Sequence, residues 1–326
     1  MMNHRTRIEA TISKAEVDRP AISLWRHFPV DDQDSSRLAR SVIELQRAYD
    51  FDLVKITPAS SFCIKDWGAR DAWHGAAEGT REYTHRVIQH PSDWEKLVPL
   101  DPAKGFLSEQ LDCMRMVVQE LGSDVPVIQT IFNPLSQAKN LVGNDKLAVH
   151  IRKYPVQLKI GLQTIAKSIQ RFLEASQETG IDGIFYAVQH AQYGLYSEGE
   201  YKQFGTDFDQ QALEPIELYP INMLHLHGKE VMFDRFLSYP FQIINWHDRE
   251  APPSLASASE IFSGALCGGL RRHETMVLGT PQQVIDEAQD AINQTGGRGL
   301  ILGTGCVMPT IVPWGNIHAA RKSVEV

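Results

Sequence analysis

The chain of 326 residues is long enough for one large α/β barrel or two ordinary domains. Its composition, 43% hydrophobic and 22% charged, is typical of a globular enzyme rather than of a disordered chain. Its net charge of −8 argues against non-specific binding to nucleic acid, because nothing offsets the repulsion from the phosphates.

Three features predict a cytoplasmic protein. The first residues include Arg5, Arg7 and Lys14 but lack the apolar core of a signal peptide. No stretch approaches the 18 or so apolar residues of a membrane span, so no membrane partner is expected. The cysteines have no close-spaced pattern and are interpreted as free cytosolic thiols. They are Cys63, Cys113, Cys267 and Cys306.

Apolar spacing predicts helices and strands that alternate along the chain. The predicted strands lie at 21–25, 53–57, 125–132, 184–188, 221–227, 241–246, 268–271 and 300–303. The predicted helices lie at 5–16, 35–49, 106–122, 155–178, near 201–217, near 229–237 and at 256–265, with another that begins at Thr280-Pro281 and a last one from about Trp314. Thr280 is a predicted N-cap with Pro281 in the first turn, and Gly296-Gly297 ends that helix.

The segment 58–104 differs from the rest of the chain. It contains Trp67, Trp73, Trp94, Tyr83 and several prolines, with little periodicity. A connection this long is usually a functional lid or an insertion. We expect its tryptophans to form the core of the insertion rather than a stacking platform.

Eight strands that alternate with helices predict a (β/α)8 TIM barrel, as a single domain over residues 1–326 with a long insertion after the second strand. A doubly wound sheet also fits the alternation. That fold usually has a glycine-rich turn after its first strand, whereas Arg26-His27-Phe28-Pro29 has no glycine. In a barrel, catalytic residues lie at the carboxyl ends of the strands.

The predicted strand ends collect polar and histidine-rich residues. They are Arg26, His27, Thr57, Asn133, Gln189, His190, His225, His227, His247, Asp248, Arg271, Arg272 and Cys306. His225 and His227 share one face of their strand, because side chains at i and i+2 point the same way. With Cys306 they would bind zinc through two imidazoles and one thiolate, which leaves a fourth position open for substrate.

Other interpretations of these residues stay open. His247, Asp248 or Glu250 would serve as a displaceable fourth ligand or fix an imidazole tautomer. His190 and His247 would otherwise be hydrogen-bonded residues of the cleft, and Cys306 a small buried apolar residue. Arg271-Arg272 is either a solvated pair or faces an anionic substrate.

Three C-terminal segments resemble the signature of the uroporphyrinogen decarboxylase superfamily. They are Leu278-Gly279-Thr280-Pro281, Thr295-Gly296-Gly297-Arg298-Gly299 and Ile301-Leu302-Gly303-Thr304-Gly305-Cys306. The opening is similar to the same superfamily in Arg5-x-Arg7-Ile8, Val17-Asp18-Arg19-Pro20, Trp25-Arg26 and Asp52-Leu53-Val54-Lys55. The resemblance covers nearly the whole chain, with weak matches at 58–124 and 189–220, and it implies the same barrel.

The decarboxylase branch of this superfamily uses a motif like Trp-Leu-Met-Arg-Gln-Ala-Gly-Arg-Tyr, whose two arginines meet substrate carboxylates. Arg26 matches the first arginine, but Val30 stands at the second. The essential aspartate after strand two is replaced by Ile56-Thr57-Pro58-Ala59, and the late histidine falls on Thr304. These three departures count against decarboxylation of a tetrapyrrole or a related acidic substrate, which is the alternative function.

The other branch contains the cobalamin-dependent methyltransferases, with zinc ligands in His-x-Cys-Gly after strand five and Gly-Cys after strand eight. His225-Leu226-His227-Gly228 matches the first motif with histidine in place of cysteine, and Gly305-Cys306 matches the second. The resemblance implies zinc-dependent methyl (one-carbon) transfer to a thiol substrate from a corrinoid on a partner protein. His227 keeps a metal ligand at this position, but imidazole is a harder donor than a thiolate. The identity of the methyl acceptor and that of the metal therefore stay open.

Within this hypothesis the remaining strand-end residues have assigned roles. Arg26, His27, Asn133 and Gln189 are predicted to bind substrate, and His190, His247 and Asp248 to act in catalysis. A barrel that binds a corrinoid or tetrapyrrole without turnover is a second alternative. A metal-dependent hydrolase is a third, but its His-x-His normally follows strand one rather than strand five.

Overall fold

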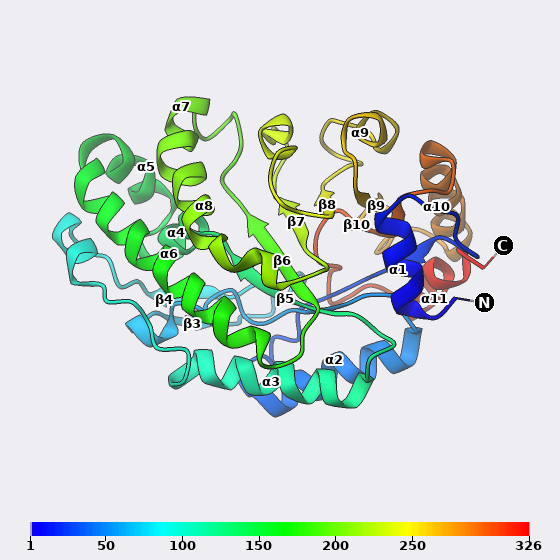
Figure 1. Cartoon of the computed structure of the whole chain (residues 1–326), viewed down its shortest axis with the longest axis horizontal. Helices are drawn as coiled ribbons and strands as arrows, with labels where there is room; N and C mark the ends of the chain where they lie inside the picture. Colours follow the sequence, from blue (N-terminus) through cyan, green and yellow to red (C-terminus); the bar gives the residue numbers. More distant parts are fainter. Residues whose placement is uncertain (1, 326) are drawn as a thin grey trace.

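Eight parallel strands form the centre of the computed structural model, which describes residues 2–325 (Figure 1). They are β1 (Ala21–Ile22), β2 (Val54–Ile56), β5 (Val127–Phe132), β6 (Gly183–Val188), β7 (Met223–Leu226), β8 (Ile243–Trp246), β9 (Ala265–Leu270) and β10 (Leu300–Thr304). Their order is β1-β10-β9-β8-β7-β6-β5-β2. The edge strands meet, because the Asp52 N–H donates to the Ile22 carbonyl at 2.8 Å and Ser23 Oγ donates to the Leu53 carbonyl at 2.8 Å. The predicted barrel fold is confirmed.

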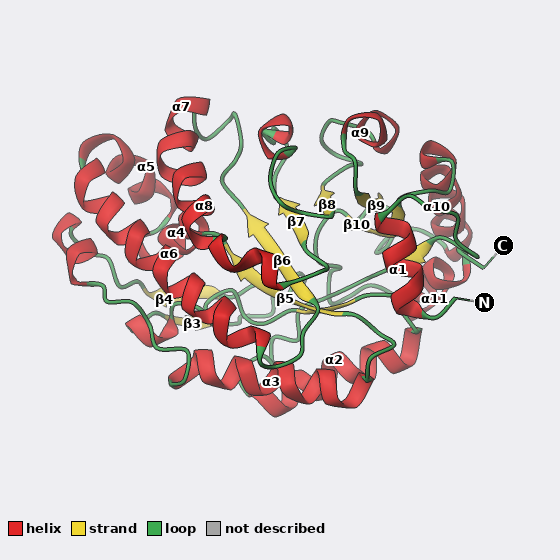
Figure 2. Cartoon of the chain, viewed as in Figure 1, coloured by secondary structure: helices red, strands yellow, loops and turns green. Residues whose placement is uncertain are grey.

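Helices surround the strands (Figure 2). They are α1 (His4–Ile12), α2 (Ser35–Tyr49), α3 (Gly105–Leu121), α4 (Pro134–Val142), α5 (Asn144–Lys153), α6 (Pro155–Gln177), α7 (Glu198–Tyr201), α8 (Asp207–Ala212), α9 (Leu255–Ile261), α10 (Pro281–Thr295) and α11 (Trp314–Lys322). A π-helical turn, η3 (Lys202–Thr206), joins α7 to α8. The strands are buried along their whole length, as expected where helices cover a parallel sheet. Among the described residues, no helix has the length and apolar character of a membrane span.

Local sequence signals explain how α10 begins and ends. The Thr280 side chain accepts a hydrogen bond from the Gln283 N–H, and the Gln283 side chain accepts one from the Thr280 N–H. Pro281 opens the first turn, and Gly296 ends the helix in the left-handed region at φ 62°. The predicted N-cap and helix stop are both confirmed.

Three predicted elements differ from the structure. The strand predicted at 268–271 runs over Ala265–Leu270, and the helix before it ends at Ile261. Gly268 lies inside this strand because the Asp248 carboxylate occupies the space of a Cβ. The helix predicted near 229–237 is a single 3-10 turn, η5 (Phe233–Phe236). Helices α4 and α5 were not predicted, and α4 is buried almost all round.

The predicted insertion at 58–104 contains an antiparallel pair, β3 (Arg70–Ala72) and β4 (Glu82–His85), and two 3-10 turns, η1 (Lys65–Trp67) and η2 (Pro91–Lys96). Trp94 is fully buried, packs against Gly161 and donates Nε1–H to His150 Nδ1 at 2.8 Å. It anchors the insertion against α6, as expected of a core tryptophan.

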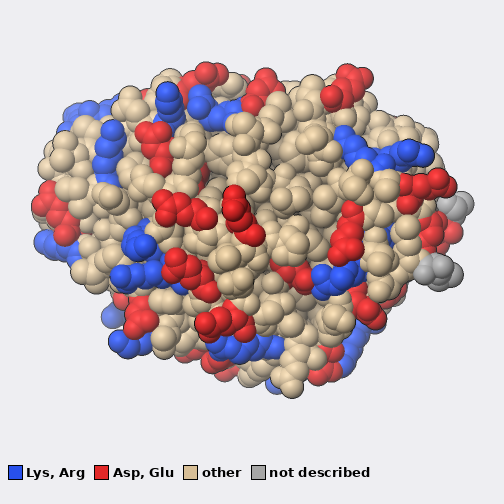
Figure 3. Space-filling model, viewed as in Figure 1, with Lys and Arg blue, Asp and Glu red and all other residues tan. Residues whose placement is uncertain are grey.

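Charged side chains of both signs are interspersed on the face shown in Figure 3. This mixture accords with the negative net charge, and it offers nucleic acid no continuous basic surface on that face.

Candidate functional site

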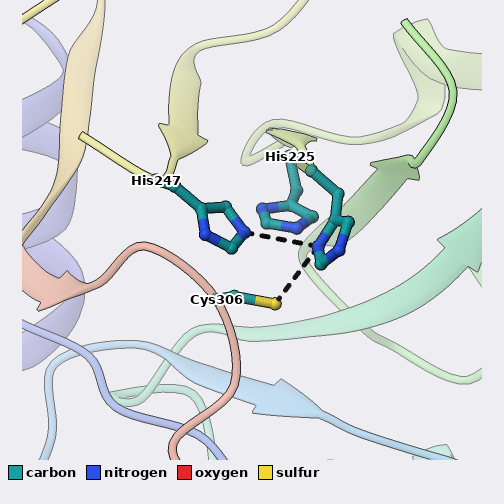
Figure 4. A group of neighbouring side chains, drawn as sticks. His225, His247 and Cys306 are labelled. Atoms are coloured by element: carbon teal, nitrogen blue, oxygen red, sulfur yellow. Dashed lines mark hydrogen bonds between the residues drawn. The ribbon is translucent and has the colours of Figure 1, made fainter. Parts of the chain in front are cut away.

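The carboxyl ends of three strands bring four metal-ligand side chains together. His225 lies in β7 with His227 directly after it, His247 follows β8, and Cys306 follows β10. One ligand atom from each of these residues lies within 4.8 Å of all the others. Figure 4 shows the imidazoles and the thiol converging from different strands. The predicted group of His225, His227 and Cys306 is therefore assembled, with His247 as a fourth member.

The spacing inside this group suits a zinc ion. His227 Nδ1 lies 3.3 Å from His247 Nε2 and 3.7 Å from Cys306 Sγ. A tetrahedral zinc with ordinary bond lengths separates two nitrogen ligands, or a nitrogen and a sulfur ligand, by about 3.3–3.6 Å. The nitrogen–nitrogen distance falls in this range, and the nitrogen–sulfur distance lies just above it.

Asn245 orients one of the imidazoles. Its Nδ2 donates to the carbonyls of Cys267 at 2.8 Å and Thr304 at 3.1 Å, so its Oδ1 must face His225. Asn245 Oδ1 lies 2.6 Å from His225 Nδ1, which places the proton on Nδ1. The lone pair on Nε2 is thereby directed away from Asn245 and is available to a metal.

The electrostatics of the group favour a thiolate. Burial opposes ionisation of Cys306, but His225, His227 and His247 hold the pKa of this thiol well below its ordinary value. Burial lowers the pKa of His225. The pKa of His227 is raised despite its burial, because of its hydrogen bond to Cys306. Thiolate is the form in which cysteine binds metals.

A cavity of about 480 Å³ opens onto three of the four ligand residues, His225, His227 and Cys306. Its walls come from the strand ends and from the insertion, which contributes residues 58–60, 78–83 and Arg86. Aromatic rings of Trp25, Phe185 and Tyr83 also line it, among others. The cavity therefore combines a metal-ligand group, apolar walls and a cover formed by the insertion.

The structure places the other predicted site residues differently. His27 and Gln189 line the cavity, whereas Arg26, Asn133, His190 and Asp248 do not. Arg26 borders a separate crevice with side chains of α2 and lies 5.8 Å from the Phe28 ring.

The remaining three lie outside the lining of the cavity. Asn133 caps α4 and donates to Asp209 at 3.0 Å. His190 is buried, which lowers its pKa to about 3. Asp248 accepts the Gly269 N–H at 3.1 Å, and burial raises its pKa to about 7. These contacts give Asn133 and Asp248 roles in holding neighbouring strands and helices.

Two important residues, Lys55 and Asn245, were not predicted. Lys55 lies within β2, lines the cavity and donates to Thr57 Oγ1 at 3.0 Å. Burial lowers the pKa of Lys55 to about 7. Both are polar side chains inside otherwise apolar strands, and this departure from the apolar pattern could have marked them as candidate site residues. Lys139 and Arg86 also line the cavity but have no such local signal.

Comparison with known proteins identifies the family. The family model for uroporphyrinogen decarboxylase (URO-D) matches residues 5–325. A methyltransferase from Methanosarcina mazei has a similar structure at a TM-score of 0.84 and 18% identity, over 99% of this chain and 98% of that chain. A B12-independent methionine synthase from Shewanella sp. W3-18-1 matches at a TM-score of 0.62 and 13% identity, over 96% of each chain. No curated protein matches the sequence. At these identities the solved structures support the fold, and the family match shows that the chain belongs to the uroporphyrinogen decarboxylase (URO-D) family.

Proposed function

We propose that the chain is a zinc-dependent methyltransferase that passes a methyl (one-carbon) group to a thiol substrate. The observation that carries this proposal is the His/Cys group, with ligand atoms within 4.8 Å of one another, at the wall of a cavity. The similar folds of a methyltransferase and a methionine synthase support it. The donor in our proposal is a methyl group on the corrinoid of a partner protein, presented at the cavity.

His225, His227 and Cys306 would hold the zinc, and the 3.7 Å between His227 Nδ1 and Cys306 Sγ is close to the separation of two zinc ligands. Zinc, when bound, lowers the pKa of a thiol and holds it as a thiolate. The thiolate sulfur forms the new bond to the methyl carbon, and the electron pair of the broken bond stays with the donor. The thiol proton needs an acceptor beside the proposed metal.

We assign that proton to His247. A catalytic zinc site keeps one position for substrate, so one of the four ligand residues must be exchangeable. His247 has a second neighbour outside the group, since its Nδ1 lies 3.7 Å from Glu250 Oε2. His27 and Gln189, which line the cavity, are proposed to contact the substrate as the sequence predicted.

Decarboxylation of an acidic substrate is the alternative, and cationic side chains in the cavity favour it. Lys55, Arg81, Arg86 and Lys139 all line the cavity. Against it, the position of the second motif arginine is Val30, which is 60% exposed and does not line the cavity.

The test is a methyl-transfer assay on the zinc-loaded protein with methylcobalamin as donor and a panel of thiols. Thiol-dependent loss of the methylcobalamin absorbance is expected, and the Cys306→Ala variant should abolish it. A porphyrinogen decarboxylation assay runs in parallel. Decarboxylation without methyl transfer would favour the alternative. A co-purified corrinoid or tetrapyrrole absorbance with neither activity would favour a binding protein.

Replacement of Asn245 by leucine is expected to weaken zinc binding by about tenfold to a hundredfold, because His225 loses the acceptor that fixes its tautomer. Competition with a chromophoric chelator measures the affinity. Asn316→Leu is the matched control, since Asn316 is also buried and donates to two carbonyls, those of Met276 and Gly279. Equal zinc affinity in the Asn245 and Asn316 variants would contradict the role of Asn245.

A further inference from the structure

The tip of the β3–β4 hairpin, residues 73–80, extends along the cavity and across the ends of neighbouring strands. Residues 78–80 line the cavity. The hairpin follows β2, yet its tip meets His27 after β1, Thr310 after β10 and Arg272 after β9. These three strands are successive neighbours in the sheet, in the order β1-β10-β9. The tip therefore reaches across one side of the barrel end at which the His/Cys group lies.

The base of the hairpin is firmly held. Arg81 Nε donates to Asp71 Oδ1 at 2.8 Å, and Arg81 NH1 donates to the Pro29 carbonyl at 2.7 Å. The side chains of Arg81 and Asp71 are only 9% and 1% exposed. Separation of a buried pair would leave an uncompensated charge out of water, which is costly. We therefore expect the base to stay in place when the tip moves.

The tip itself buries little surface. Residues 74–77 are all exposed, and no helix or strand includes residues 73–80. Its backbone contacts the barrel where the Ala77 carbonyl accepts from the Thr310 N–H at 2.6 Å and from Thr310 Oγ1 at 2.8 Å. Segments with few buried contacts and exposed hydrogen bonds open at a low cost in free energy. The tip is thus a mobile element on a fixed base.

Two glycines in the left-handed region allow the tip to bend. Gly75 has φ 86° and Gly79 has φ 77°, which other residues rarely adopt. A Cβ at Gly75 would meet nothing within 4 Å, whereas a Cβ at Gly79 would lie 2.5 Å from His27 Cβ. Gly75 therefore stands in open space as a hinge, and Gly79 lets the tip press against the barrel.

Glu78 holds the tip by charge. Its Oε1 lies 3.2 Å from Arg272 NH1 and 3.1 Å from His273 Nε2. Among residues 2–325, Arg272 has no other carboxylate within 4.0 Å, and its side chain is only 9% exposed. Movement of the tip would leave this guanidinium without its counter-ion, so the contact favours the closed position. The Glu78 side chain is 35% exposed and can be hydrated, which keeps the cost of opening moderate.

We propose that residues 73–80 form a lid that opens and closes over the His/Cys cavity, with Glu78 as the latch that holds it closed. Closure keeps water from the reacting groups, and opening admits molecules too large for the closed cavity of about 480 Å³. The inference depends on the cavity and its cover alone. It therefore stands or fails independently of the methyl-transfer reaction proposed above.

Cys306 reports the opening of the lid, because it lines the cavity and the other three cysteines do not. The test compares how fast small iodoacetamide and a bulky fluorescein maleimide label Cys306 in chelator-treated protein, with the label located by mass spectrometry. Glu78→Gln is expected to raise the ratio of the bulky to the small rate by about fivefold, the effect of losing one partly exposed ion pair.

Glu82→Gln is the matched control, because Glu82 also lines the cavity but forms no ion pair within 4.0 Å among residues 2–325. Gly79→Ala tests the lid by another route, since the added Cβ would collide with His27, and it should raise the ratio as well. Circular dichroism and the Tm show whether each variant folds. An unchanged ratio in Glu78→Gln, or an equal rise in Glu82→Gln, would overturn the latch. An unchanged ratio in both Glu78→Gln and Gly79→Ala would overturn the lid.

Hydrogen exchange of the zinc-loaded protein shows where the chain moves. Glu78→Gln is expected to speed exchange in residues 74–80 and at the Thr310 amide, which donates to the Ala77 carbonyl. Residues 91–96, around the buried Trp94, should keep their wild-type rates. Faster exchange throughout the insertion would indicate general loosening and would contradict a lid that moves on a fixed base.

Discussion

Wild-type protein reconstituted with zinc is expected to hold about one zinc ion per chain, and the His227→Ala variant is expected to lose at least about a hundredfold in affinity. We expect His227 to contribute most to the affinity, because its Nδ1 lies 3.3 Å from His247 Nε2 and 3.7 Å from Cys306 Sγ. Its removal takes away the imidazole that lies beside both of these side chains. Metal content by mass spectrometry and chelator competition give the ratio and the affinity.

His190→Ala is the matched control for this loss. His190 is also a buried histidine at a strand end, but it lies outside the His/Cys group. Its replacement should leave the zinc ratio unchanged. A wild-type ratio near zero would refute the metal site, and so would full zinc content in a His225→Ala/Cys306→Ala double variant.

Much of this group could be predicted from the sequence, because side chains at the ends of strands follow simple positional rules. Residues at i and i+2 of a strand share a face, and the carboxyl ends of parallel strands meet at one end of a barrel. These two rules place His225, His227 and Cys306 together without any tertiary information, and the structure agrees.

The same rules could not decide which of two neighbouring residues at a strand end faces the cavity. Adjacent side chains point to opposite faces, and the sequence does not say which one faces the cavity once the strand becomes irregular. In the structure His27 faces the cavity and Arg26 faces α2. His247 joins the His/Cys group, whereas Asp248 bonds to the backbone of β9.

Residues inside strands were missed for a related reason. The search considered strand ends, but Lys55 and Asn245 lie within β2 and β8 and still contact the site. Their importance follows from the cost of burying a polar group in the barrel, which demands a partner. Asn245 has its partners in His225 and two carbonyls, whereas Lys55 forms no ion pair within 4.0 Å among the described residues.

The amino ends of the strands are held by a different cluster, centred on Asp52. Its Oδ1 accepts from Arg7 at 2.7 Å, and its Oδ2 accepts from Arg19 at 2.7 Å and from the Ile22 N–H at 2.9 Å. His4 Nδ1 lies 2.9 Å from Asp52 Oδ1. The carboxylate thus joins α1 and β1 to the start of β2, where the barrel closes. Arg7, Arg19 and Asp52 stand in the opening motifs that resemble the family, and the structure gives these motifs a role in stability.

Replacement of Asp52 by alanine is expected to lower the free energy of unfolding by about 3–5 kcal/mol, because it leaves the buried Arg7 without its inner partner. Urea unfolding at pH 7 measures this loss. Asp50→Ala is the matched control. Asp50 also meets His4 and an arginine, but its side chain is 61% exposed, so a change below about 1 kcal/mol is expected. Similar losses in the two variants would contradict the role of Asp52.

The pKa of the Asp52 carboxylate predicts how the free energy of unfolding depends on pH. Burial alone would raise the pKa of Asp52, but hydrogen bonds from His4 and Arg19 and the charge of Arg19 hold it at about 2, below the ordinary 3.8. A pKa depressed in the folded state gives stability that is present above the unfolded pKa and is lost as pH falls toward the folded pKa. Wild type should therefore lose about 2 kcal/mol through Asp52 between pH 4 and pH 2. Urea midpoints across this range should fall less steeply for Asp52→Ala than for wild type, and parallel curves would show that Asp52 is not the titrating group.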